Sequence, residues 1–313
     1  MNRFSQATDG ATGRIGVVVL TYNSADIVCR CITALKSTLA TRDFEIVVVD
    51  NNSSDDSVAV VKHAHSDVTL IQTGANLGYA RGNNVGGRHL LTRAVQYIAF
   101  VNPDVLVGPD TLSDMERVLR EHQDAGCVGG LPVVHGRISD KSFRNKPTSF
   151  EKLLLYSAAE YFPVLRSLLR PVVRKMRGHH FVLSETTRPV YAVSGACIMF
   201  PASVYERMGG FDEATFLFQE EFIISERLLK LGLKVYACPS AAYDHIHGHS
   251  VNRRPLRAAQ IFIDSEQYLL RCYYKKGLFV RSFFLIFRYM DWTLNACMTL
   301  SRQAKQMRRQ GRH

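Results

Sequence analysis

Two adjacent carboxylates, Glu220 and Glu221, lie between the aromatic residues Phe218 and Phe222 in the segment TFLFQEEFIISE. A buried carboxylate is unfavourable unless it is paired or hydrogen-bonded. Apolar surroundings and a second carboxylate both raise the pKa of a carboxyl group towards working pH, which suits a general base. The segment therefore predicts proton abstraction. A strand-to-helix corner, with one Glu capping the helix and the other in solvent, would also explain it.

Polar residues also end three apolar runs in the first half of the chain. These ends are Thr21-Tyr22-Asn23, Asp50-Asn51-Asn52-Ser53-Ser54 and Asn102-Pro103-Asp104. One polar strand end is unremarkable, because loops begin with polar residues everywhere. Three ends directed at one crevice predict a pocket for a polar ligand.

The apolar pattern predicts the elements that position these ends. Residues 15–20, 45–50, 68–72 and 97–102 predict strands, and residues 24–39, 55–64, 79–91 and 110–122 predict helices, the third of them weakened by glycine. Ser24 is the expected N-cap of the first helix. Continuous apolar strands that alternate with helices indicate a parallel α/β sheet, whose ligands bind beyond the carboxyl ends of the strands.

Several functional classes are disfavoured by missing motifs. The chain has no GxxxxGK[ST] and no GxGxxG after a strand, which argues against a P-loop NTPase and a dinucleotide-binding enzyme. DHIHGHS offers three histidines at alternate positions, but no Cys or Glu partner for a zinc site is evident. The seven cysteines form no CxxC pair, which favours reduced thiols in the cytoplasm.

The net charge of +11 is concentrated in two basic segments. About 140–188 reads as an amphipathic insertion, and about the last 60 residues look helical, strongly apolar and basic. No signal peptide and no apolar run of about 18 residues is seen, so we expect a protein that is neither secreted nor integral. The mixture of Leu and Phe with Arg favours an anionic membrane surface as the partner over nucleic acid.

An ordered set of motifs resembles a known family. VVVLTYNS, VVVDNNSSDDS, NLGYARGNNVG, FVNPDV, VSGACIMF, GGFDE and DHIHGHS are similar, in this order, to the inverting family 2 glycosyltransferases of GT-A fold. Within them the chain resembles the bacterial rhamnosyltransferase-like members, over roughly residues 15–250. The resemblance implies a Rossmann-like, mostly parallel sheet flanked by helices over residues 14–252, with a C-terminal helical appendage at 253–313.

The resemblance also assigns residues to the donor side. It implies that the nucleotide sugar is bound by Thr21, Asn23, Asp50, Asn76, Gly78, Arg81 and Asn102. Asp104 would hold a divalent metal, Mg²⁺ or Mn²⁺, on the diphosphate, and His245 would lie near that metal. The usual DxD motif is Asn102-Pro103-Asp104 here, and one carboxylate with phosphate oxygens and water can hold a hard cation.

On the acceptor side, the resemblance makes Glu221 the general base that deprotonates the acceptor hydroxyl. The family pair is usually Glu-Asp, so Glu221 is one methylene longer than the expected residue, and Glu220 stays an alternative base. Asp212 would border the acceptor.

The implied function is transfer of one sugar, with rhamnose favoured, from a dTDP- or UDP-linked donor to a glycan or lipid-linked acceptor in bacterial surface polysaccharide synthesis. The expected location is the inner face of the cell membrane, with peripheral attachment. Two alternatives stay open: a non-catalytic nucleotide-sugar-binding protein, and a nucleotidyltransferase, which would need a Gly-rich basic loop where this chain has TYNSAD.

Overall fold

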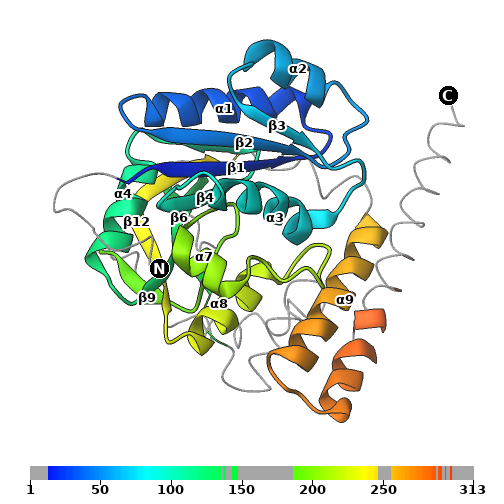
Figure 1. Ribbon diagram of the computed structural model, residues 1–313. Helices are drawn as coiled ribbons and strands as arrows, with labels where there is room; N and C mark the ends of the chain where they lie inside the picture. The colour runs from blue at the N-terminus through cyan, green and yellow to red at the C-terminus, as the bar shows by residue number, and fades with distance from the viewer. Residues whose placement is uncertain are drawn as a thin grey trace, which may run out of the picture. The chain divides into compact units, whose positions relative to one another are not determined.

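Figure 1 shows a computed structural model, which describes residues 13–134, 137–138, 143–144, 146, 186–245, 255–286, 288–290, 293 and 297. The chain divides into two compact units. The first comprises Met1–Arg144, Ser184–Phe216 and Glu220–Ser250. The second comprises Asn145–Leu183, Leu217–Gln219 and Val251–His313. Within the described residues, no helix combines the length and hydropathy needed to cross a membrane.

The first unit is built on one large sheet with the strand order β3-β2-β1-β4-β11-β6-β12-β5, to which β7 and β9 add at β6 and β12. The strands are β1 Ile15–Thr21, β2 Phe44–Asp50, β3 Thr69–Gln72, β4 Tyr97–Val101, β5 Val105–Val107, β6 Ala125–Val134, β7 Arg137–Ile138, β9 Arg188–Val190, β11 Cys197–Pro201 and β12 Lys234–His245. A small separate sheet pairs β8 Phe143–Arg144 with β10 Ala192–Val193.

The four predicted strands β1 to β4 are confirmed and are parallel to one another. The second half of the sheet is mixed. Strand β11 is antiparallel to both β4 and β6, whereas β12 is parallel to β6 and antiparallel to β5. The sheet is thus mostly but not wholly parallel.

Helices cover both faces of this sheet. They are α1 Ala25–Leu39, α2 Ser57–Ala64, α3 Gly78–Leu91, α4 Thr111–Glu121, α7 Ala202–Met208 and α8 Glu220–Lys230. One buried cluster joins α1 and α4 to the sheet, and a second joins α3, α7 and α8 to it. Figure 1 shows α1 and α3 on opposite sides of the strands. Ser24 precedes α1 as predicted, but its hydroxyl donates to the carbonyl of Tyr22 and makes no capping bond to the helix.

The glycines of α3 have a packing role that the sequence reading missed. A Cβ atom at Gly86 would lie 2.6 Å from Cγ1 of Val18, and one at Gly82 would lie 2.5 Å from Cδ1 of Leu20. Real Cβ contacts are not this short, so the helix approaches β1 more closely than any larger residue permits. The glycines that lower helix propensity thereby set the helix-to-sheet distance.

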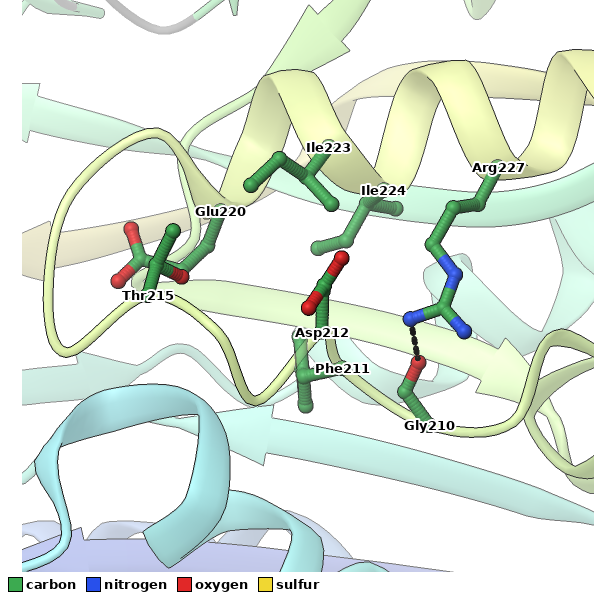
Figure 2. Close-up of a pocket in the computed structure, with 8 residues that line it drawn as sticks. All are labelled: Gly210, Phe211, Asp212, Thr215, Glu220, Ile223, Ile224 and Arg227. Atoms are coloured by element: carbon green, nitrogen blue, oxygen red, sulfur yellow. Dashed lines mark hydrogen bonds between the residues drawn. The ribbon is translucent and has the colours of Figure 1, made fainter. Parts of the chain in front are cut away.

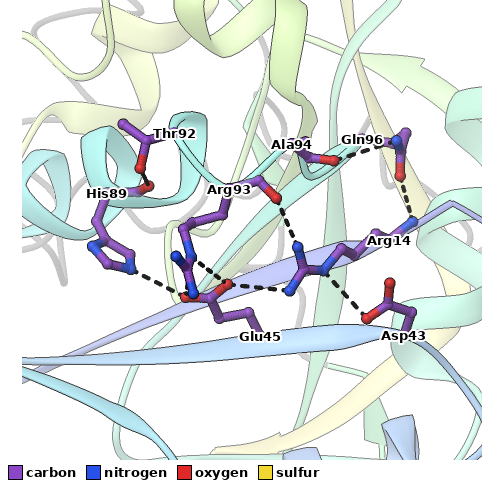
Figure 3. Close-up of polar contacts among 8 residues, drawn as sticks. All are labelled: Arg14, Asp43, Glu45, His89, Thr92, Arg93, Ala94 and Gln96. Carbon is purple, nitrogen blue, oxygen red and sulfur yellow. Dashed lines mark hydrogen bonds and ion pairs between the residues drawn. The ribbon is translucent and has the colours of Figure 1, made fainter.

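A polar cluster ties β1 and β2 to the end of α3 and the following turn (Figure 3). Glu45 accepts hydrogen bonds from His89, Arg93 and Arg14 at 3.1 to 3.3 Å. Burial raises the pKa of Glu45, but the bonds from His89 and Arg93 outweigh it and leave that pKa below its ordinary value. The cluster therefore stabilises the fold above the ordinary carboxyl range and loses this contribution as the pH falls through the lowered pKa.

A buried ion pair links α4 to the turn after α1 and to the start of β1. The guanidinium of Arg42 contacts the carboxylate of Glu116 on α4, and both side chains are almost fully buried. Glu116 also accepts a hydrogen bond from the backbone N–H of Gly13, at 2.8 Å. The pair joins the turn after α1 to α4 and to the residue that leads into β1.

We expect Glu116→Gln to lower the free energy of unfolding by about 3–5 kcal/mol, because it leaves the Arg42 guanidinium buried without its counter-charge. The matched control is Glu121→Gln on the same helix, whose carboxylate is exposed and lies 3.8 Å from Arg117. An exposed pair of this kind contributes about 0–1 kcal/mol. Denaturant unfolding compares the two, and equal losses would contradict this account.

Candidate active site

The carboxyl edge of the sheet gathers several predicted donor residues. Thr21 and Asp50 end their strands as register partners, and the N–H of Asn51 donates to the carbonyl of Thr21 at 2.8 Å. Asp50 is 2% exposed and accepts the N–H of Ser53. The hydroxyl of Thr21 is buried and has no hydrogen-bond partner within the described residues. This edge therefore carries a buried carboxylate and an unsatisfied hydroxyl, groups that a polar ligand can engage.

Asn23 links two strand ends through a left-handed backbone. Its φ is 50°, a conformation that Asn tolerates better than most residues. Its side-chain oxygen accepts the N–H of Ser54 at 2.8 Å, and its own N–H donates to the hydroxyl of Ser53. These bonds hold the loops after β1 and β2 together.

Asn51 performs the same task on the other side of β2, and the sequence reading had not assigned it a role. Its amide nitrogen donates to the side-chain oxygen of Asn76 at 3.1 Å and to the carbonyl of Gly78. Its amide oxygen accepts the N–H of Leu77. Asn76 also accepts the N–H of Gly78. A polar residue directly after a buried strand was the available signal.

Gly78 begins α3 where no other residue fits. Its φ is 80°, and a Cβ atom there would lie 2.3 Å from the carbonyl oxygen of Phe216. The same carbonyl accepts the N–H of Tyr79 at 2.7 Å. The segment before α8 thus closes directly over the start of α3.

Arg81 lies on the exposed side of α3. Its Nε donates to the carbonyl of Glu213 at 3.1 Å. Its two terminal nitrogens have no hydrogen-bond partner in the part of the chain that the structure describes, so a phosphate could use them. Nothing here places a phosphate beside them, and donor binding by Arg81 stays a prediction.

Asp104 and His245 are brought together by the sheet. Strand β12 pairs with β5 so that His245 lies opposite Val105, next to Asp104. The Nε2 atom of His245 is 3.3 Å from Oδ2 of Asp104. Oδ1 of Asp104 is buried and has no hydrogen-bond partner among the residues described. Asn102 is held close by, since its N–H donates to the carbonyl of Ala196 at 2.8 Å.

This pair fits the divalent cation that the sequence predicted. A buried carboxylate oxygen without a partner is a suitable ligand for a hard cation, and an imidazole beside it can ligate or orient. The described residues contain no cluster of three or more His, Cys, Asp or Glu side chains around one point. The protein would therefore supply few ligands, as in sites where substrate phosphates and water complete the coordination.

The two adjacent glutamates begin α8 and differ in environment. Glu220 is buried, and Glu221 is half-buried. Oε1 of Glu221 accepts the N–H of Gly195 at 3.2 Å, and its Oε2 has no hydrogen-bond partner in the described ranges. Negative charge is favoured at the first turn of a helix. Both carboxylates thus belong to the helix start, and neither is simply in solvent.

Tyr79 completes a chain of hydrogen bonds to Glu221. Its hydroxyl donates to the carbonyl of Gly195 at 2.7 Å, and the N–H of Gly195 binds Glu221. Burial raises the pKa of Tyr79 well above its ordinary value, and the charges of Glu220 and Glu221 raise it further. The tyrosine therefore stays a hydrogen-bond donor at any ordinary pH. Its position inside the NLGYARGNNVG motif was the signal that the sequence reading left unused.

Asp212 and Glu220 line a narrow hollow between α8 and the loop that precedes it (Figure 2). Asp212 accepts the N–H of Ala214 at 3.0 Å. The guanidinium of Arg227, also on the lining, donates to the carbonyl of Gly210 at 3.0 Å. These hydrogen bonds hold two of the residues that line the hollow. The predicted acceptor residue, Asp212, and the alternative base, Glu220, both line it.

Tyr243 is a buried residue of β12, two positions before His245. Burial and the neighbouring Cys197 thiol raise its pKa, and the carboxylates of Asp104 and Glu221 both add to the rise. His247, His249 and most of the predicted insertion lie outside the described residues.

Comparison with known proteins agrees with this geometry. Residues 16–207 match the family model described as glycosyl transferase family 2. The chain is 29% identical over 254 residues to N-acetylglucosaminyl-diphospho-decaprenol L-rhamnosyltransferase of Mycobacterium tuberculosis, which covers 78% of this chain and 80% of that protein. It is 22% identical over 255 residues to the low-salt glycan biosynthesis hexosyltransferase Agl10 of Haloferax volcanii. That match covers 80% of this chain and 72% of that protein.

Solved structures show the same fold. A Pyrobaculum calidifontis mannosyltransferase in complex with GDP-mannose and Mn²⁺ superposes with a TM-score of 0.56 at 18% identity, over 94% of this chain and 76% of that one. Staphylococcus aureus TarS residues 1–349 superposes with a TM-score of 0.50 at 16% identity, over 84% of this chain and 74% of that one. The architecture is that of GT-A glycosyltransferases, and the chain is a glycosyltransferase that belongs to glycosyl transferase family 2.

Proposed function

We propose that this glycosyltransferase moves a single sugar, with rhamnose favoured, from a dTDP- or UDP-linked donor to a hydroxyl of a glycan or lipid-linked acceptor, and inverts the anomeric centre. The observation that carries the mechanism is that the loop of Asp104 and the carboxylate of Glu221 meet at two adjacent residues: the N–H of Asn102 donates to the carbonyl of Ala196, and the N–H of Gly195 donates to Glu221. Asp104 suits the diphosphate side of the reaction, and Glu221 suits the acceptor side. The Mycobacterium tuberculosis relative, named for a diphosphate-linked lipid acceptor, supports the sugar and the acceptor class.

In the proposed reaction, the acceptor oxygen attacks the anomeric carbon as the bond from that carbon to the diphosphate oxygen breaks. Glu221 takes the hydroxyl proton on Oε2, the oxygen that Gly195 leaves available. The N–H of Gly195 orients the Glu221 carboxylate before the transfer. Asp104 and His245 would hold a divalent cation, Mg²⁺ or Mn²⁺, which supplies positive charge to the leaving diphosphate when bound.

Donor recognition is assigned to the strand ends. Asp50 would receive the nucleotide base, and Thr21, Asn23, Asn76, Gly78, Arg81 and Asn102 would line the rest of the donor. Asp212 would border the acceptor. We further propose that residues 14–252 form the transfer domain, and that residues 253–313 form an appendage on the inner face of a bacterial cell membrane, where surface polysaccharides are assembled.

Glu221→Gln should abolish transfer while donor binding persists, because the amide keeps its shape but cannot accept a proton. A positioned base contributes about 10²–10⁴-fold, so we expect a rate loss of that order. The matched variant is Glu220→Gln, which should transfer at close to the wild-type rate. Near-wild-type transfer by Glu221→Gln, together with loss in Glu220→Gln, would reassign the base to Glu220.

A thermal-shift panel of dTDP, UDP, GDP, CMP and ADP, each with and without Mn²⁺, identifies the donor class. A ligand at about 100 times its dissociation constant adds about 2.7 kcal/mol to stability. We expect stabilisation by one nucleotide, enhanced by Mn²⁺, and loss of the enhancement in Asp104→Asn. Asp244→Asn, at an exposed position on β12, serves as the control. A flat panel from folded protein would contradict the donor site.

Tyr79→Phe tests whether Glu221 depends on the Gly195 peptide for its position. The ring stays and keeps its edge contact with Phe211, but the hydrogen bond to Gly195 is lost. We expect kcat to fall by roughly tenfold or more, with donor KM nearly unchanged and the base limb of the pH–rate profile displaced. Tyr191→Phe, which removes a hydroxyl bonded to Glu226, is the control. An unchanged pH profile would argue for a purely structural tyrosine.

A further inference from the structure

The second unit contains a helical hairpin with one face packed. Helix α9 spans Pro255–Cys272, and residues 278–286 and 288–290 are also helical. Phe284 is 1% exposed, and Arg288 makes a two-pronged bond to Glu266 on α9 at 2.7 and 2.8 Å. The side chain of Gln267 donates to the carbonyl of Arg281. The inner face of the second helical segment is therefore fixed on α9.

The outer face of that segment is apolar and exposed. Nine large apolar side chains are exposed among the residues that the structure describes, and six of them lie between 278 and 290. Phe279 is 85% exposed, Leu278 73%, Ile286 63% and Met290 55%, with Phe283 and Tyr289 between them. Residues 279, 283, 286 and 290 follow the i, i+4, i+7, i+11 spacing of one helix face. An apolar patch of this kind marks an interaction surface.

The charges that directly precede this face in the chain are positive, whereas the exposed carboxylate of Asp264 on α9 lies near its other end. Lys275 and Lys276 are exposed directly before the segment, and Arg271 is exposed at the end of α9. The sequence has no Asp or Glu from 271 to 290. The surface thus combines an apolar stripe with a positive margin at its N-terminal end, which is the composition of a helix that lies in the interface of an anionic bilayer.

We propose that the exposed face formed by Leu278, Phe279, Phe283, Ile286, Tyr289 and Met290 docks on an anionic lipid bilayer, with the apolar side chains inserted at the level of the acyl chains and Lys275 and Lys276 at the headgroups. The proposal rests on the membrane association within the proposed function and names its surface. A second copy of the chain is a poorer occupant, because a symmetric contact would bring the same cations together without counter-charge.

Vesicle flotation of the full chain tests this surface. The probes are phosphatidylcholine vesicles with and without about a third of phosphatidylglycerol, at low and high salt. We expect at least tenfold stronger binding to the anionic vesicles, reduced by salt. Phe279→Ser with Ile286→Ser should lower this binding at least tenfold. Leu229→Ser, an exposed apolar residue of α8, is the control and should bind within twofold of the wild type.

Lys275→Gln with Lys276→Gln provides a second variant that leaves the apolar face intact, so the test survives if the double serine variant does not fold. It should lose the preference for anionic vesicles. Equal binding by wild type and both double variants would overturn the proposal, and so would a wild-type dimer that the serine variant dissociates.

Transfer to a water-soluble acceptor is measured in parallel. The serine variant should transfer to it at the wild-type rate, because none of its changes touches the transfer site. Normal transfer with no vesicle binding by the wild type would overturn the docking surface alone. Vesicle binding without nucleotide stabilisation would overturn the proposed function alone.

Discussion

The active site depends on the reversal of one strand. Strand β11 runs antiparallel beside β4, so its first residues lie at the edge where the parallel strands β1, β2 and β4 end. The bond from the N–H of Asn102 to the carbonyl of Ala196 fixes that meeting point. The peptide of Gly195, one residue earlier, then faces both Tyr79 and Glu221. A parallel β11 would begin at the opposite edge, and the turn that holds Glu221 would lie a strand length away from Asp104.

The same arrangement explains how residues far apart in the chain come together at this edge. Strand β12 carries Tyr243 and His245 to the carboxyl edge beside β5, where Asp104 lies. Helix α8 belongs to the buried cluster that contains α3 and α7, and it contributes Glu221 at its first turn. Two layers of the fold thereby supply the two sides of the proposed reaction. Close packing makes this arrangement rigid, since α3 can approach β1 only through its glycines.

The first half of the fold could be predicted from the sequence because its signals are local. Buried strands and amphipathic helices alternate up to α4, and each strand ends in polar residues. In the second half, strand β6 could not be predicted because it contains glycine and proline, AGCVGGLPVV, and the direction of β11 could not be predicted because it comes from the pairing partners of that strand. Strand β12 reaches His245 for a similar reason, since its later residues pair with β5 and β6. Tertiary pairing, more than propensity, decides these elements.

The site residues show the same division. Asp50, Asp104 and the Glu220-Glu221 pair were evident as carboxylates at strand or helix ends. Asn51, Tyr79 and Gly195 lie in motifs that the sequence shows, but their hydrogen-bond partners depend on the tertiary structure. Both glutamates have aromatic neighbours in the sequence, but only Glu220 is buried in the structure.

This distribution gives the longer side chain at Glu221 a physical reason. A base must be held in one orientation yet keep an oxygen for the incoming proton. Glu221 satisfies both conditions by giving Oε1 to the Gly195 N–H and keeping Oε2 without a partner in the described chain. An Asp at the first turn of α8 would be one methylene shorter, and its carboxylate would have to choose between the Gly195 peptide and the acceptor. Glutamate reaches the Gly195 N–H and still presents its second oxygen, so Glu221 fits the proposed role of the base, and Tyr79 binds the carbonyl of the same glycine.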